Sequence, residues 1–157
     1  YGTGNKRGGN YGTLGADGET AVANESILKA MITGRDAIIA GDVAGATEAA
    51  NAVIRAVTII YSQATMRYAT KVEGDIAKGD LAKARVHQAE GLSFWRVLEP
   101  RIGALGAAGA GTIATINSAY DLANEPGSGA TADEVRSALY PIWDMLDIDR
   151  EDIGELQ

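Results

Sequence analysis

The only histidine of the chain, His87, is followed three residues later by Glu90, and the two side chains are of the types found in metal sites. Residues three apart in a helix leave the same face, so this imidazole and this carboxylate would lie side by side. Such ligands suit iron, manganese or zinc, and helical bundles build metal sites from pairs of this kind on facing helices. The spacing is compatible with half of a metal site, whereas on spacing alone a buried histidine that is hydrogen-bonded to a carboxylate and stabilises the core is the favoured interpretation.

The helix expected around His87 is apolar on two sides. Leu92 and Trp95 fall on one side of its helical wheel, whereas His87 and Phe94 fall on the other. A helix that is apolar on two sides is central in a bundle. We therefore expect His87 and Glu90 to point into the protein.

Other helices offer oxygen ligands that would complete the site. Tyr68 lies on the apolar stripe of the preceding helix, Glu73 lies at the end of that helix, and Glu25 flanks the stripe of the first helix. Carboxylate, phenolate and imidazole groups are all suitable ligands for iron. Tyr68, Glu73 and Glu25 are therefore candidate ligands ranked below His87 and Glu90.

Catalytic chemistry finds little support in these residue types. The chain has no cysteine, which excludes thiolate zinc sites, disulfides and cysteine nucleophiles. A serine hydrolase would need His87 as its base, and no serine lies in a Gly-x-Ser-x-Gly motif. Two-carboxylate glycosidase chemistry is not excluded by residue type, but no spacing indicates it. We expect that the protein is not an enzyme.

The length and charge of the chain limit the number of domains and the kinds of partner that we expect. Its 157 residues predict one domain, and its 14 basic and 21 acidic residues give a net charge of −7, which argues against a nucleic-acid partner. The longest uncharged run, residues 102–120, contains four glycines and is too polar for a membrane span. The first residue is Tyr1, so we expect a processed product or one piece of a larger chain.

From Thr20 onward, apolar residues recur at the three-and-four spacing of amphipathic helices, which predicts an all-α fold. Gly-Asp steps at 41–42 and 79–80 end one helix and cap the next, and Thr131 with Glu134 predicts a capping box for the last helix. One long helix, from Val43 to about Glu73, predicts an elongated bundle of about five helices over residues 20–147. The apolar residues of the first helix that we expect to face the core are Ile27, Leu28, Met31, Ile32, Ile38 and Ile39.

The two ends of the chain are expected to lie outside this bundle. Residues 1–19 form a glycine-rich N-terminal arm, for which we predict an irregular covering loop because glycine favours turns. Residues 148–157 form an acidic C-terminal tail that we expect to be solvated. A calcium loop beginning at Asp147 is a weaker alternative, because its sixth position is Asp152 rather than glycine.

A second class of function follows from a row of small residues. Gly103, Ala107 and Gly111 are spaced four apart, so that another helix could approach this face closely. With the glycine-rich arm, this face suits a non-catalytic structural or interaction module that self-assembles or packs on a neighbouring domain. Such a module would need no metal.

Two segments carry a resemblance to a known family. Residues 87–100, His-Gln-Ala-Glu-Gly-Leu-Ser-Phe-Trp-Arg-Val-Leu-Glu-Pro, and residues 60–69, Ile-Tyr-Ser-Gln-Ala-Thr-Met-Arg-Tyr-Ala, resemble the low-iron-inducible, iron-assimilatory periplasmic proteins of green algae, the FEA-type domains. The resemblance extends over about residues 11–100, with some extension to the last helix. Helical imelysin-type iron proteins, which also use a His-x-x-Glu step, are the nearest competing family.

The resemblance implies a secreted or periplasmic protein that is not an enzyme and that assists iron assimilation. Iron, ferric or ferrous, would then be its metal, held by His87 and Glu90 with Glu73, Tyr68 and Glu25 as lower-ranked partners. The family's habit of carrying more than one domain also implies that this chain is one unit of a larger protein. A homo-oligomer is the expectation of the structural-module alternative, in which the chain packs against copies of itself.

Overall fold

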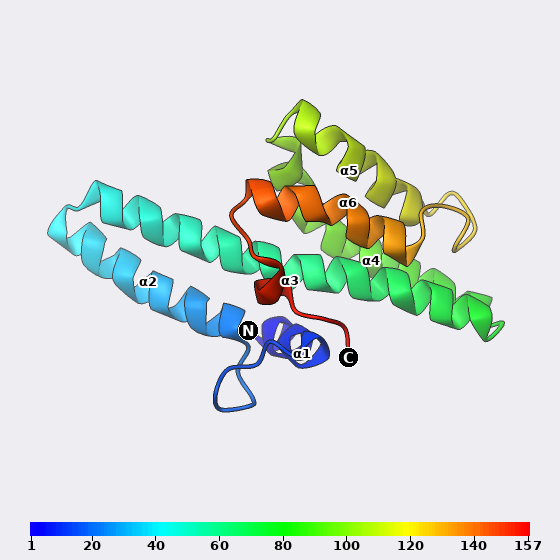
Figure 1. Ribbon diagram of the computed structural model, residues 1–157, viewed down its shortest axis with the longest axis horizontal. Coiled ribbons are helices and arrows are strands. Elements are labelled where there is room, and N and C mark those ends of the chain that lie inside the picture. The colour runs from blue at the N-terminus through cyan, green and yellow to red at the C-terminus, as the bar shows by residue number, and fades with distance from the viewer. The chain divides into compact units, whose positions relative to one another are not determined.

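The computed structural model describes residues 1–157 and consists of helices without a strand (Figure 1). The all-α prediction is confirmed, with seven helices in place of about five. In chain order they are α1 (Gly2–Tyr11), α2 (Val22–Ala40), α3 (Val43–Ala77), α4 (Leu81–Gly103), α5 (Ala107–Ala119), α6 (Ala132–Met145) and α7 (Arg150–Ile153).

The chain divides into two compact units. Unit 1 comprises residues 1–60 and 148–157, and unit 2 comprises residues 61–147. The long helix α3 contributes its first half to unit 1 and its second half to unit 2.

The predicted starts of α3, α4 and α6 are confirmed by their capping bonds, whereas α3 extends beyond Glu73 to Ala77 and α4 continues through Pro100 to Gly103. Asp42 accepts a hydrogen bond from the backbone N–H of Gly45 at 2.9 Å, and Asp80 accepts one from Lys83 at 3.0 Å. Thr131 and Glu134 form the predicted capping box at the start of α6. These side chains satisfy backbone N–H groups that have no partner within the helix.

The prediction of an irregular loop at the N-terminus is wrong, because residues 2–11 form helix α1. Gly4 and Gly8 lie directly against Asn24 and Ala21, so the absence of side chains lets α1 approach the start of α2. Asn24 donates to the carbonyl of Tyr1 at 2.7 Å. This packing outweighs the low helix propensity of glycine.

Residues 148–157 pack into unit 1. Ile153 is buried, and the backbone N–H of Glu155 donates to the carbonyl of Tyr11 at 3.1 Å. Arg55 of α3 pairs with Asp152 of α7 at 2.6 Å. The segment is therefore anchored by an apolar side chain, a backbone bond and an ion pair, and it is not the solvated tail that its acidic composition predicts.

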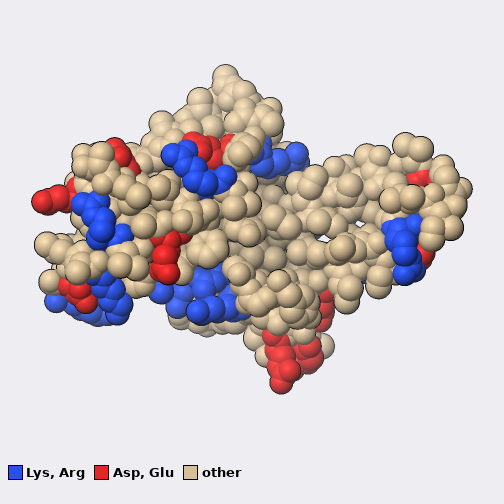
Figure 2. Space-filling model, turned by 180° about the vertical axis from the view of Figure 1, so that it is seen from behind, with Lys and Arg blue, Asp and Glu red and all other residues tan.

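The apolar stripe expected to bury α2 is largely exposed, which corrects the prediction for the first helix. Of its six residues only Ile27 is half-buried, and Leu28, Met31, Ile32, Ile38 and Ile39 are exposed. The buried positions of this helix are taken by three alanines and Asn24 instead. In Figure 2, acidic and basic side chains are interspersed over the face shown, and the hairpin of α2 and α3 is mostly free of charge apart from a small cluster near its end.

The core of unit 2 contains both tryptophans. Trp95 of α4 is fully buried and donates its indole N–H to Asn117 at 2.8 Å, and Asn117 donates in turn to Glu99 at 2.9 Å. The hydrogen bond from Asn117, followed by that from Arg96, lowers the pKa of the Glu99 carboxyl. Trp143 donates to the hydroxyl of Ser62 at 3.1 Å. Each indole N–H is therefore paired inside the core, as burial requires.

Close packing in unit 2 depends on glycines other than those in the predicted row. Gly91 of α4 lies directly against the ring of Tyr120, and Gly109 of α5 lies against the carbonyl of Ile102. Gly103, Ala107 and Gly111 are exposed, and nothing lies within 4 Å of the space above Gly111. Gly103 belongs to α4 and the other two residues to α5, so the row is not the face of one helix, and a side-chain carbon of Ile113 lies 3.8 Å from where a β-carbon of Gly103 would be.

Helix α3 is long and apolar enough to span a membrane by length and composition. An 18-residue window of α3 has a mean hydropathy of 1.3, and 28% of the window is buried. A single helix of this kind is weak evidence, since a core helix of a soluble protein meets the same criteria.

A candidate metal site around His87

His87 of α4 is held by a carboxylate of α3. Its Nδ1 atom lies 2.5 Å from Oδ2 of Asp75, and the two side chains are only 11% and 6% exposed. The ammonium of Lys83 lies 3.9 Å from the other oxygen of Asp75. A buried carboxylate is costly without partners, so the imidazole and the ammonium together stabilise the charge on Asp75.

The second ring nitrogen of His87 faces a cation. Because Nδ1 donates its proton to Asp75, Nε2 of the neutral ring carries a lone pair. The ammonium of Lys71 lies 3.2 Å from Nε2, and Oε2 of Glu90 lies 3.9 Å from it. The lone pair on Nε2 of His87 therefore points to a position that the ammonium of Lys71 already occupies.

Aromatic rings form one wall of this cluster. The ring of Tyr68 lies 5.7 Å from that of His87 and stacks on Phe94 at 5.3 Å, measured between ring centroids. The ammonium of Lys71 lies 4.9 Å from the centroid of Tyr68, within the range of a cation–π interaction. This wall limits the access of water to His87.

The structure brings together three of the five predicted ligands. His87, Glu90 and Tyr68 lie in one cluster, although Glu90 is about half exposed instead of pointing into the protein. Glu73 lies elsewhere on α3, where it accepts the backbone N–H of Ala132 at 2.8 Å and so caps α6. Glu25 belongs to unit 1, where its carboxylate lies against Gly15.

Sequence reasoning missed Asp75 and Lys71. Tyr61, Tyr68 and Asp75 are spaced by seven residues and therefore lie on one face of α3. Extending the predicted stripe by one step would have found Asp75 beyond Tyr68. Lys71, three residues after Tyr68, lies on the same face.

The cluster offers only part of the ligands that a metal ion needs. No three His, Asp or Glu side chains converge on one point in the chain. An ion at Nε2 of His87 would have the carboxylate of Glu90 beside it, with water at its remaining positions, and Lys71 would have to move aside. The bond from His87 to Asp75 is of the kind that orients metal-ligating histidines and makes them more basic.

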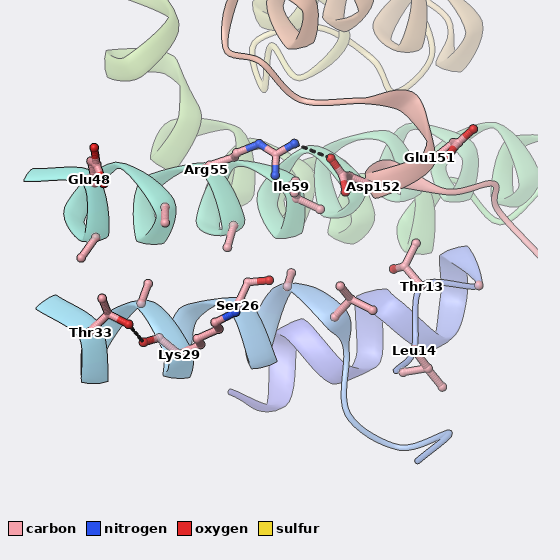
Figure 3. A pocket seen from close by; sticks show the side chains of 17 residues that line it. Thr13, Leu14, Ser26, Lys29, Thr33, Glu48, Arg55, Ile59, Glu151 and Asp152 are labelled. Carbon is pink, nitrogen blue, oxygen red and sulfur yellow. Dashed lines mark hydrogen bonds and ion pairs between the residues drawn. The ribbon is translucent and has the colours of Figure 1, made fainter. Parts of the chain in front are cut away.

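A hollow of about 600 Å³ lies within unit 1, between α2 and α3 (Figure 3). Alanines form much of its wall, and the ion pair of Arg55 with Asp152 lies at one side of it. Ser26 and Thr33 add hydroxyl groups from α2. The hollow reflects the small side chains between these two helices.

Comparison with known proteins adds no relative: no family model, no curated protein and no solved structure matches the chain.

Proposed function

We propose that this protein binds iron at the His87 cluster, through Nε2 of His87 and the carboxylate of Glu90. The observation that carries the proposal is the short bond from Nδ1 of His87 to the buried Asp75. That bond leaves Nε2 as the ring nitrogen with a lone pair, which faces the ammonium of Lys71 without metal, and it fixes the orientation of the ring. Imidazole with carboxylate is a suitable donor pair for iron.

Lys71 gives the proposal a specific mechanism. Its ammonium lies where a metal ion would approach Nε2, so protein without metal holds a positive charge at that position. Binding of a cation would require Lys71 to turn outward, and the repulsion between the two charges would limit the affinity. The site would therefore bind iron reversibly, as suits a protein that passes iron on.

The resemblance to iron-assimilatory proteins of green algae supports the same function. It would place the chain in the periplasm or outside the cell, as a non-enzymatic iron carrier. In this proposal Glu73 and Glu25 are not ligands, because the structure gives their carboxylates other positions.

Calorimetric titration of the protein with ferrous iron, under anaerobic conditions, tests the proposal. We expect saturable binding that is abolished in His87→Ala and Glu90→Ala, and weakened about 10- to 100-fold in Asp75→Asn. Lys71→Gln is expected to bind more tightly than the unaltered chain, because the competing charge is gone.

Glu125→Gln, which removes a carboxylate from an exposed loop, serves as the matched control and is expected to leave binding unchanged. Circular dichroism of each variant checks that the helices are retained. Absence of saturable binding, or the same binding in His87→Ala, would assign His87 and Asp75 to core stability alone.

A further inference from the structure

Helix α2 places its small residues inward. Ala23, Ala30 and Ala37 are buried, and Gly34 lies against the β-carbon of Ala49 in α3. On the α2 side, this contact between the two helices of the unit 1 hairpin therefore uses alanine and glycine and buries no large apolar side chain. An amphipathic helix of a monomeric protein normally does the reverse and buries its large apolar residues.

The large apolar residues of α2 form one outward face. At about 100° per residue they fall within an arc of roughly 120°, so they are contiguous along the helix. These residues are Leu28, Met31, Ile32, Ile38 and Ile39, between 46% and 78% exposed. A contiguous exposed apolar surface on a protein marks an interaction site.

The charges on this face are few and specifically placed. Between Lys29 and Asp42 the only charged residues are Arg35 and Asp36, which pair with each other at 2.7 Å and are both more than half exposed. On the wheel, Arg35 lies in the middle of the apolar face and Asp36 at its edge. One positive and one negative residue at adjacent positions are complementary to the same two residues of a second copy under two-fold symmetry.

We propose that the apolar face of α2 pairs with the same face of a second copy of this chain, with the two α2 helices antiparallel. A two-fold axis between Arg35 and Asp36 places each Arg35 opposite the partner copy's Asp36, because position n faces position 71 − n. The same register places Ile32 opposite Ile39 of the other copy. Apolar contacts thus flank a central pair of ion pairs.

A lipid surface fits this face less well than a second copy does. A membrane would require burial of Arg35 and Asp36 among acyl chains, at a cost that the apolar residues would have to offset. In the antiparallel pair the two charges, which already pair with each other within one copy, each also face an opposite charge of the other copy. The proposal involves unit 1 only and does not depend on metal binding at His87.

Sedimentation velocity over a wide range of protein concentration tests the proposal. We expect a concentration-dependent dimer, and we expect Ile32→Glu and Ile39→Glu each to weaken dimerisation by more than about tenfold, since each places a carboxylate in the apolar contact. Val86→Glu, at an exposed apolar residue of α4, is the matched control and is expected to leave the dimer unchanged.

Charge reversal tests the register and the symmetry. Arg35→Glu and Asp36→Lys are each expected to weaken the dimer, because like charges then face each other across the axis. An equimolar mixture of the two single variants is expected to restore association, since every acidic group then faces a basic one. Both residues are exposed, so neither variant is expected to affect folding.

Four results would overturn the proposal. The first is a monomer at every concentration. The second is a dimer that none of the α2 variants weakens. The third is a failure of the two charge variants to restore association on mixing. The fourth is a monomer that co-sediments with phosphatidylcholine vesicles and loses this binding in Ile39→Glu, which would assign the face to lipid.

Discussion

The carboxylate of Asp75 accepts a 2.5 Å hydrogen bond from Nδ1 of His87, and this contact joins α3 to α4 inside unit 2. It fixes the orientation of the only imidazole in the chain. The lone pair on Nε2 then faces Lys71 and Glu90, at the half-exposed edge of the cluster. The same bond therefore supports both the stability of unit 2 and the proposed iron site.

Loss of the Asp75 carboxylate is expected to destabilise the protein. Asp75→Ala removes a hydrogen bond to a charged group and leaves the buried His87 without its partner, at a cost of about 2–3 kcal/mol in the free energy of unfolding. Urea denaturation followed by circular dichroism measures the change. Glu125→Ala, on an exposed loop, is the control, and equal stability of the two variants would contradict the contact.

Gly91 is expected to tolerate no side chain. A β-carbon at this position would overlap the ring of Tyr120, which is fully buried and donates its hydroxyl to the carbonyl of Thr65. Gly91→Ala is therefore expected to cost about 1–3 kcal/mol by overpacking.

Gly111→Ala tests the same glycine-to-alanine substitution at a position where no atom lies within 4 Å of the added β-carbon. Here the methyl group meets nothing, and the higher helix propensity of alanine is expected to stabilise the chain by about 0.5–1 kcal/mol. Thermal unfolding of both variants gives the sign of each change. Opposite signs support the described packing of α4, whereas a stable Gly91→Ala would contradict it.

The capping box of α6 makes part of the stability dependent on pH. Hydrogen bonds from the backbone N–H and the hydroxyl of Thr131 lower the pKa of Glu134 below its ordinary value of 4.5. A carboxyl with a lowered pKa in the folded state stabilises the fold when ionised. This contribution is present above pH 4.5 and is lost as the pH falls through the lower, folded-state pKa.

Glu134→Gln is accordingly expected to lower the melting temperature at pH 7 and to approach the unaltered chain as the pH falls below 4.5. Thr131→Ala, which removes the cap itself, is expected to cost about 1 kcal/mol. Melting curves over a series of pH values measure both effects. A difference that persists undiminished in acid would contradict the role of the Glu134 charge.

The C-terminal segment is expected to stabilise unit 1. Ile153 of α7 is buried, so Ile153→Ala should cost about 2–4 kcal/mol through lost burial and the cavity that remains. Glu151→Ala, two residues earlier and exposed, is the control and should change little. Urea unfolding followed by helicity distinguishes the two. Equal stability would mean that the segment is a free tail.

Local sequence signals predicted the helices well because each acts over one turn. Asp42, Asp80 and Thr131 cap the helices that they were predicted to start, and these bonds involve residues three positions apart. The glycine-rich first segment was predicted wrongly. Its helix depends on Asn24 and Ala21 far along the chain, and no local signal contains that contact.

The periodicity of α2 showed that its apolar residues share one face, but not what covers that face. The prediction assumed a partner within the chain, whereas Leu28 and Ile39 are exposed. The candidate site was predicted in part for a similar reason. The i, i+3 step of His87 and Glu90 is local, whereas Asp75 reaches His87 only through the packing of α3 on α4.

Trp95 and Trp143 are the only tryptophans of the chain, and both belong to unit 2. The protein therefore carries an intrinsic optical label for one unit alone, because indole fluorescence reports on 61–147 while ellipticity reports on every helix. Overlaid denaturation curves from the two signals would read out the cooperativity of the chain directly. Coincident curves would describe a single transition, and an ellipticity change that precedes the fluorescence change would describe unit 1 melting first.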